Sequence, residues 1–65
     1  MNQQMVDLMA KYPLGTYMRK VSGSHWSGYV VGYYSTELTP QGLAIESDAH
    51  AGSVQIYPVK ALEAV

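Results

Sequence analysis

The absence of cysteine from a chain of only 65 residues is the feature that most constrains its fold. A domain of this size buries about 60% of the surface that its unfolded chain exposes, so its own core provides little stability. Disulfides, a metal or partner subunits usually supply the rest, and without cysteine neither a disulfide nor a thiolate zinc site can form. Self-association is therefore the expected support.

Charged side chains are also few, with four Lys or Arg and five Asp or Glu, while 48% of the residues are hydrophobic. A monomer's surface usually carries more charge, so we expect neighbours to cover much of this one. The formal net charge of −1 and the lack of a basic cluster beyond Arg19-Lys20 argue against a nucleic-acid partner. In a symmetric tetramer, however, four copies of Lys20 around one cavity would attract small anions.

The sequence carries no membrane or targeting signal. It has no run of about 18 apolar residues, and its N-terminus lacks the basic and apolar regions of a signal peptide. We therefore expect a cytoplasmic protein without a membrane partner. No repeat, linker or low-complexity segment divides the chain.

The opening segment has helical periodicity. Apolar residues fall at i, i+3, i+4 and i+7, namely Met5, Leu8, Met9 and Tyr12. Asn2 is available as a cap, and Pro13 ends the pattern. We predict a short helix within an N-terminal segment, residues 1–15, that packs on the rest of the chain and has no catalytic role.

From Thr16 onward the pattern changes to short β-rich runs separated by Gly, Ser, Pro and Asp. The predicted strands are Thr16–Val21, Trp26–Ser35, Leu43–Ser47 and Ser53–Tyr57. Gly28 and Gly32 indicate a bend or bulge in the second run, and Val59–Ala64 suits a helical turn or a last short strand. Four or five strongly curved strands predict an all-β fold, a small barrel spanning residues 16–65.

Three well-known motifs are present only as fragments. The P-loop spacing of Gly23 and Gly28 is not followed by Lys and Ser or Thr. Ser47, Asp48 and His50 are triad residue types, but adjacency in sequence does not create triad geometry, and no nucleophile elbow is present. Two histidines without matched spacing do not indicate a metal site. We predict neither hydrolysis nor a bound metal.

The strand before Pro58 carries the most informative side chains. Alternation places Gln55 and Tyr57 on one face and Val54 and Ile56 on the other. An amide beside a phenol can orient a flat heterocycle with amide groups, because Gln both donates and accepts and Tyr adds a ring and a hydroxyl. The same pattern also fits the solvent face of an ordinary strand. These residues alone leave both interpretations open.

Larger segments of the sequence together form a distinctive pattern. They are Arg19-Lys20, Ser22-Gly23, Trp26, Gly28, Val31-Gly32, Tyr34, Leu38–Pro40, Gly42, Glu46-Ser47, Ala49-His50, Gly52–Val59 and Ala61–Glu63. In order and without internal gaps, this pattern resembles the type II, trimethoprim-insensitive dihydrofolate reductases over about three quarters of the chain. The string Gly52–Val59 is the most specific part, whereas the first seventeen residues lie outside the resemblance.

The resemblance implies an SH3-like barrel that assembles as a homotetramer around one central pore. In that family the pore is the single active site, and NADPH and dihydrofolate enter it from opposite mouths. The expected activity is hydride transfer from NADPH to dihydrofolate, with trimethoprim resistance as its consequence.

Carried over residue by residue, the resemblance implies catalytic roles for three pore residues. Gln55 would hold ring and amide groups, the backbone of Ile56 would bind the nicotinamide carboxamide, and Tyr57 would hydrogen-bond to the cofactor. Lys20 would attract the cofactor phosphates and the glutamate tail of folate. The full expected binding set is Lys20, Ser24, Gly52, Ser53, Val54, Gln55, Ile56 and Tyr57.

The resemblance also implies interface roles for His50, Ser47 and Trp26. A neutral His50 imidazole would hydrogen-bond across subunits near Ser47, so its protonation in mild acid should weaken the assembly. For Trp26 the alternative is an aromatic side chain in the core of one protomer.

The predicted chemistry is passive, because no carboxylate lies in the expected pore segments to act as a general acid. Solvent or protonated substrate would supply the proton, and alignment of the two rings would supply the rate. The alternative is a non-enzymatic SH3-like module that binds a proline-rich peptide, or a scaffold relative with another ligand. Its aromatic groove would consist of Trp26, Tyr29, Tyr33 and Tyr34.

Overall fold

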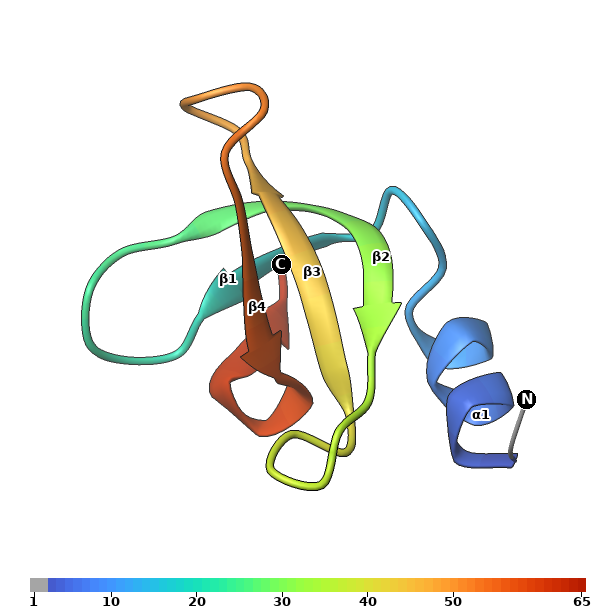
Figure 1. Ribbon diagram of the computed structural model, residues 1–65. Coiled ribbons are helices and arrows are strands. Elements are labelled where there is room, and N and C mark those ends of the chain that lie inside the picture. Colours follow the sequence, from blue (N-terminus) through green and yellow to red (C-terminus); the bar gives the residue numbers. More distant parts are fainter. Residues whose placement is uncertain (1–2) are drawn as a thin grey trace.

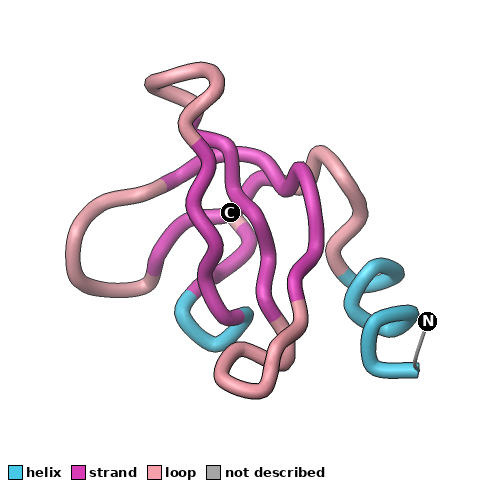
Figure 2. The backbone as a smooth tube through the Cα atoms, in the orientation of Figure 1, coloured by secondary structure: helices cyan, strands magenta, loops and turns pink. Residues whose placement is uncertain are grey.

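The computed structural model describes residues 3–65 (Figure 1), and the predicted cap Asn2 lies outside the described residues. The described elements are α1 (Gln3–Lys11), β1 (Tyr17–Lys20), β2 (Ser27–Tyr34), β3 (Gly42–Ser47), β4 (Val54–Pro58), a 3₁₀ turn η1 (Val59–Ala61) and β5 (Leu62–Ala64). Figure 2 shows that strands dominate and that helix is confined to α1 and the short η1. The prediction of a mostly β chain with about five strands and a short N-terminal helix is confirmed.

The five strands form one antiparallel sheet in the order β4-β3-β2-β1-β5. β2 and β3 separate β1 from β4 in this order, yet the Lys20 ammonium on β1 lies 4.9 Å from the centroid of the Tyr57 ring on β4. The sheet must therefore curl strongly to bring these two strands together, as Figure 1 shows. The curl gives the sheet an inner side and an outer side.

Two glycines of β2 shape this curl in different ways. The β2–β3 register shifts between Val30 and Gly32, so Val31 is an extra residue in a bulge. At Gly28 an added Cβ would lie 1.8 Å from the backbone oxygen of Glu46, so only glycine allows β2 and β3 to approach so closely. The predicted bulge is confirmed at Gly32, whereas Gly28 serves close strand contact.

The core lies on the inner side of the sheet. Its buried residues are Leu8, Met18, Val30, Leu43, Ile45 and Leu62. Leu8 anchors α1 to the sheet, and the Tyr33 hydroxyl donates a hydrogen bond to the Tyr12 carbonyl just after the helix. Met9, which belongs to the predicted apolar stripe, is 36% exposed, so the stripe that packs is narrower than expected. No helix among residues 3–65 is long and apolar enough to cross a membrane.

The boundaries of the four predicted strands agree with the structure to within one residue. The segment Val59–Ala64 was predicted as either a helical turn or a strand, and it contains both, because η1 reverses the chain and β5 then pairs with β1.

Candidate functional site

Gln55 and Tyr57 of β4 lie on the inner side of the sheet. Their partners on β3 are Ile45 and Leu43, both fully buried, and residues directly opposite each other share a face. Gln55 is nevertheless exposed at the edge of the sheet, whereas Tyr57 packs partly against the core. The pair therefore does not face outward with Val54 and Ile56, although the Gln55 side chain still meets solvent.

Four predicted binding residues meet on this inner side, and we call them the Lys20 cluster: Lys20, Ser24, Gln55 and Tyr57. The Tyr57 hydroxyl donates a hydrogen bond to Oε1 of Gln55. The Lys20 ammonium lies over the Tyr57 ring, 4.9 Å from its centroid, within the range of a cation–π contact. The same ammonium donates to the Ser24 hydroxyl, 3.2 Å away. The cluster therefore joins β1, the β1–β2 loop and β4.

The Lys20 cluster keeps hydrogen-bonding capacity for a ligand. The ion pair found among residues 3–65 is Arg19–Glu63, and Lys20 takes no part in it. Within the same residues the side-chain N–H groups of Gln55 have no protein acceptor. An unneutralised ammonium beside an exposed amide is suited to an anionic molecule that also carries amide groups.

Gly52 and Ser53 lie in the turn that precedes β4. Gly52 has a φ of 88° and donates its N–H to the Glu46 carboxylate at 2.7 Å. The Ser53 N–H donates to the His50 carbonyl at 3.0 Å, and its carbonyl accepts from the Ser47 N–H at 2.8 Å. These contacts hold the turn, and so they set where β4 begins.

Val54 and Ile56 lie on the opposite side of β4, where they are 47% and 44% exposed. Their partners on β3 are Glu46 and Ala44, whose side chains also point outward. The ladder continues to Tyr29 and Tyr34 on β2. We call this surface the outer apolar face, and its members are Tyr29, Tyr34, Ala44, Val54, Ile56 and Pro58. A protomer alone leaves this face exposed.

The predicted interface residues make contacts within one protomer. The buried Ser47 hydroxyl accepts from the N–H groups of Ala49 and His50, at 3.1 and 3.2 Å, while the His50 side chain is exposed. Trp26 packs against the core, and its indole N–H donates to the Ile45 carbonyl at 3.1 Å. For Trp26, the alternative of a residue in the protomer's own core therefore has direct support.

A second polar cluster was not predicted from the sequence, and we call it the Asp48 cluster: Tyr17, His25, Ser27 and Asp48. The Asp48 carboxylate accepts hydrogen bonds from the Tyr17 hydroxyl and from the Ser27 hydroxyl, the latter at 3.2 Å. His25 Nε2 lies 3.2 Å from the Ser27 oxygen. The bond from Tyr17 holds the pKa of Asp48 below its usual value and raises the pKa of Tyr17.

The Asp48 cluster has no signal in the sequence, because its members come from β1, the β1–β2 loop, β2 and the turn after β3. The Tyr17–Asp48 bond spans 31 residues and the Ser27–Asp48 bond spans 21. Only the strand register brings them together. Within residues 3–65, no three His, Cys, Asp or Glu side chains gather in a way that could hold a metal ion.

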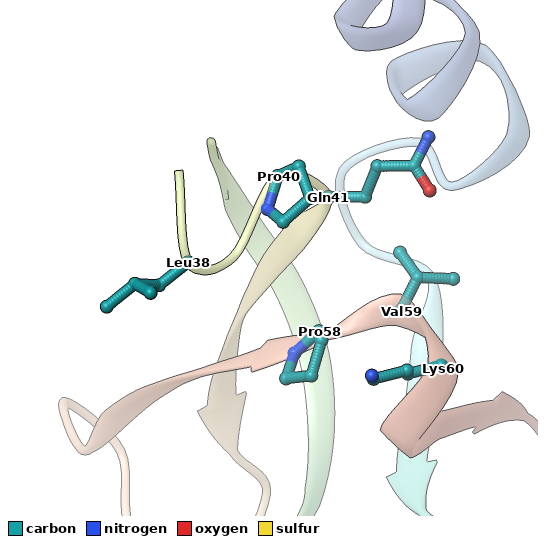
Figure 3. Close-up of a pocket in the computed structure, with 6 residues that line it drawn as sticks. All are labelled: Leu38, Pro40, Gln41, Pro58, Val59 and Lys60. Atoms are coloured by element: carbon teal, nitrogen blue, oxygen red, sulfur yellow. The ribbon is translucent and has the colours of Figure 1, made fainter. Parts of the chain in front are cut away.

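A shallow pocket elsewhere contains no predicted binding residue. Its lining residues, drawn in Figure 3, are Leu38, Pro40, Gln41, Pro58, Val59 and Lys60. The figure shows the rings of Pro40 and Pro58 on neighbouring segments, with Leu38 pointing away from both. This pocket and the Lys20 cluster have no residue in common.

The four aromatic residues of the alternative peptide-binding groove do not share a face. Trp26 and Tyr33 pack against the core, whereas Tyr29 and Tyr34 are exposed on the outer apolar face. One protomer therefore lacks the predicted aromatic groove.

Comparisons with known proteins agree on one family. The family model described as R67 dihydrofolate reductase matches residues 2–65, so the match extends through the N-terminal segment that the resemblance had left out. Two curated Escherichia coli proteins named dihydrofolate reductase type 2 are 61% and 57% identical to this chain over 56 residues. Each match covers 86% of this chain and 72% of the relative.

Proposed function

Since the chain belongs to the R67 dihydrofolate reductase family, we propose that it transfers a hydride from NADPH to dihydrofolate in a pore built by four copies. The observation that carries the proposal is the Lys20 cluster, in which one protomer brings an unneutralised ammonium, a phenol and an exposed amide together. Trimethoprim insensitivity would follow, because such a pore would lack the pocket that the drug fills in chromosomal dihydrofolate reductases.

The Lys20 cluster fits the chemical groups of both ligands. Lys20 would attract the phosphates of NADPH and the glutamate tail of dihydrofolate. The Gln55 amide would donate to a ring carbonyl or carboxamide, while its carbonyl stays oriented by the Tyr57 hydroxyl. Ser24 hydrogen-bonds to Lys20 and would line the same part of the pore wall.

Ile56 would contribute through its backbone, since β4 is the last strand of the sheet and one side of its ladder has no partner in the protomer. A carboxamide on the nicotinamide ring offers one donor and one acceptor for such a strand edge. Gly52, Ser53 and Val54 would act by fixing the position of this edge.

Assembly into a homotetramer is supported by the outer apolar face. A small domain without disulfides gains little stability alone, and this face would remain in water unless another copy covered it. As the resemblance implies, we propose that His50 and Ser47 lie near contacts between copies, and that Trp26, which packs on its own core but is only partly buried, also reaches them. In this arrangement residues 16–65 form the SH3-like barrel domain and residues 1–15 the N-terminal packing segment.

The proposed mechanism relies on alignment. NADPH would supply the hydride. Each carboxylate near the sheet is already engaged: Glu46 accepts from Gly52, Asp48 from Tyr17 and Ser27, and Glu63 from Arg19. None of the described carboxylates contacts Gln55 or Tyr57. The proton would therefore come from solvent or from substrate that is already protonated, and holding the two rings together would account for the rate.

Dihydrofolate and NADPH are the proposed small-molecule partners, with no nucleic acid and no membrane involved, and the cytoplasm is the proposed location.

The experiment that tests the proposal is NADPH oxidation by the purified protein with dihydrofolate, with and without saturating trimethoprim. We expect turnover that the drug does not inhibit. Gln55→Leu removes the amide at similar size and should lower kcat/KM by about tenfold or more. Gln41→Leu makes the same change in the β2–β3 loop and should leave kcat/KM unchanged. Absence of turnover from a confirmed tetramer would refute the proposed reaction.

A further inference from the structure

Ser24 lies in the β1–β2 hairpin loop, four residues after Lys20. The loop is closed at its base by the Lys20 N–H, which donates to the Trp26 carbonyl at 2.9 Å. The neighbouring Val21 N–H donates to the Ala61 carbonyl at 3.0 Å, so the loop is tied to η1 as well. Gly23 has a φ of 81°, which turns the loop back toward the Lys20 side chain.

The Lys20 ammonium is held from two sides. Its Nζ atom lies 3.2 Å from Ser24 Oγ and 4.9 Å from the centroid of the Tyr57 ring. A lysine side chain has four rotatable bonds along its carbon chain and loses conformational entropy when it is fixed. Two contacts on one ammonium define its position. Neither contact partner carries a charge, and the positive charge therefore remains available.

Both partners in the Lys20–Ser24 hydrogen bond retain donors. An ammonium has three N–H groups, and the hydrogen bond to the Ser24 oxygen uses one of them, whereas the contact with the Tyr57 ring involves the charge rather than a defined N–H. The Ser24 hydroxyl acts as acceptor toward Lys20, so its own O–H is available, and among residues 3–65 it meets no protein acceptor. A free N–H of Lys20 and the O–H of Ser24, whose Nζ and Oγ atoms lie 3.2 Å apart, can bind the same phosphate or carboxylate group.

We propose that Ser24 is a positioning and binding residue that, with Lys20, forms a two-donor clamp for an anionic oxygen group of the ligand. This inference rests on the proposed function for the identity of the ligands. The shared ligand chemistry is an anionic oxygen group, which NADPH carries as phosphate and dihydrofolate carries as carboxylate. Ser24 acts by fixing the ammonium over Tyr57 and by donating its hydroxyl hydrogen to the same anion.

The central test compares three loop variants in steady-state kinetics. Ser24→Ala should raise KM by about three- to tenfold while kcat changes by less than about twofold, because the clamp binds ground state and transition state alike. Ser24→Thr keeps the hydroxyl and should restore most of the affinity. Ser22→Ala removes an exposed hydroxyl from the same loop and should have no effect. Equal KM values for Ser24→Ala and the unaltered protein would overturn the clamp.

Truncated ligands distinguish the two groups that the clamp could bind, the 2′-phosphate of NADPH and the glutamate tail of dihydrofolate. If the clamp binds the 2′-phosphate of NADPH, Ser24→Ala should raise KM for NADPH and leave that for NADH unchanged. If it binds the glutamate tail, the variant should raise KM for dihydrofolate and spare a dihydropterin without glutamate. An equal rise for full and truncated ligands of both kinds would contradict a direct anion contact.

A double-mutant cycle tests whether Ser24 acts through Lys20. Ser24→Ala should raise KM by a smaller factor in Lys20→Met than in the unaltered protein, because the ammonium that it positions is gone and only its own donor to the anion is lost. Additive effects would show that Ser24 does not position Lys20.

A binding measurement separates the clamp from the proposed reaction. Titration with inorganic pyrophosphate, followed by NMR shifts of the loop amides, should show weaker binding in Ser24→Ala than in Ser22→Ala even without turnover. Turnover together with unaltered pyrophosphate binding in Ser24→Ala would refute the clamp and leave the reductase intact.

Discussion

The Lys20 cluster and the Asp48 cluster both connect distant parts of the sheet through polar side chains, but they differ in what they leave unsatisfied. In the Asp48 cluster the carboxylate accepts two hydroxyl hydrogens, and His25 lies close by. In the Lys20 cluster the ammonium has no carboxylate partner and the Gln55 amide keeps its N–H groups. A polar cluster whose groups satisfy one another supports the fold, whereas one with unused donors can bind a ligand.

The two clusters should also differ in their need for other copies. The Asp48 cluster is complete in one protomer, whereas the Lys20 cluster stands open at the sheet edge. A substitution that affects one cluster should therefore leave the other unaffected.

The largest expected effect comes from placing a charge on the outer apolar face. Ala44 lies on β3 between Gly32 and Ile56, and Ala44→Glu would bury a carboxylate in the contact that we propose between copies. We expect dissociation in sedimentation velocity and loss of turnover by about a hundredfold or more. Ala10→Glu places the same charge on the exposed side of α1 and should preserve the assembly. A fully active tetramer of Ala44→Glu would show that another surface joins the copies.

A large loss of stability is expected where β2 approaches β3. In Gly28→Ala the new Cβ would meet the Glu46 oxygen at 1.8 Å, so the strands must separate next to Ser27 and Asp48. We expect the free energy of unfolding to fall by about 2 kcal/mol or more, measured by urea denaturation. At Gly32 the nearest atom would be 3.7 Å away, and Gly32→Ala should cost less than about 1 kcal/mol. Equal losses at both positions would contradict a specific close approach at Gly28.

The Asp48 cluster should give stability a pH dependence at both extremes. Because the Tyr17 bond lowers the pKa of Asp48, its contribution is present above the unfolded value of about 3.9 and is lost as the pH falls through the folded pKa. The same bond raises the pKa of Tyr17, so stability is present below about pH 10 and is lost as the pH rises through the folded pKa.

Tyr17→Phe removes this bond and should remove both limbs of the pH dependence. We expect its urea midpoint to lie below that of the unaltered protein near neutral pH, and the difference to shrink below about pH 4 and above about pH 10. Tyr29→Phe is the matched control, because Tyr29 packs edge-on against Tyr17 but its hydroxyl has no partner among residues 3–65. A difference that stays constant across the pH range would show that the bond is not the cause.

The sequence predicts most of the fold and part of the site. Helix and strand positions follow from local periodicity, and the alternation of Gln55 and Tyr57 with Val54 and Ile56 is confirmed. Which pair faces inward depends on the β3–β4 register, and here the polar pair shares the side of the buried Leu43 and Ile45. No local pattern contains that information.

The part of the site that the sequence does not predict consists of contacts between residues far apart in the chain. The cation–π contact of Lys20 with Tyr57 depends on the curl of the whole sheet, and the Asp48 cluster depends on the pairing of β1 with β2 and of β2 with β3. By contrast, the Lys20–Ser24 bond joins two residues that are close in sequence, at the end of β1 and in the loop that follows it. The sequence shows which residue types occupy these positions. It does not show which of their hydrogen-bonding groups are paired within the protomer and which remain free for a ligand.

The smallest expected effect comes from the cation next to Lys20 in the sequence. Arg19 points to the other side of β1 and pairs with Glu63 at 2.7 Å, with both side chains about half exposed. Exposed pairs contribute little, so Arg19→Met should change the free energy of unfolding by less than about 1 kcal/mol. It should also leave KM for NADPH unchanged, whereas Lys20→Met should raise it by about tenfold. Equal rises in KM would mean that overall positive charge, rather than the unneutralised ammonium of the Lys20 cluster, attracts the ligand.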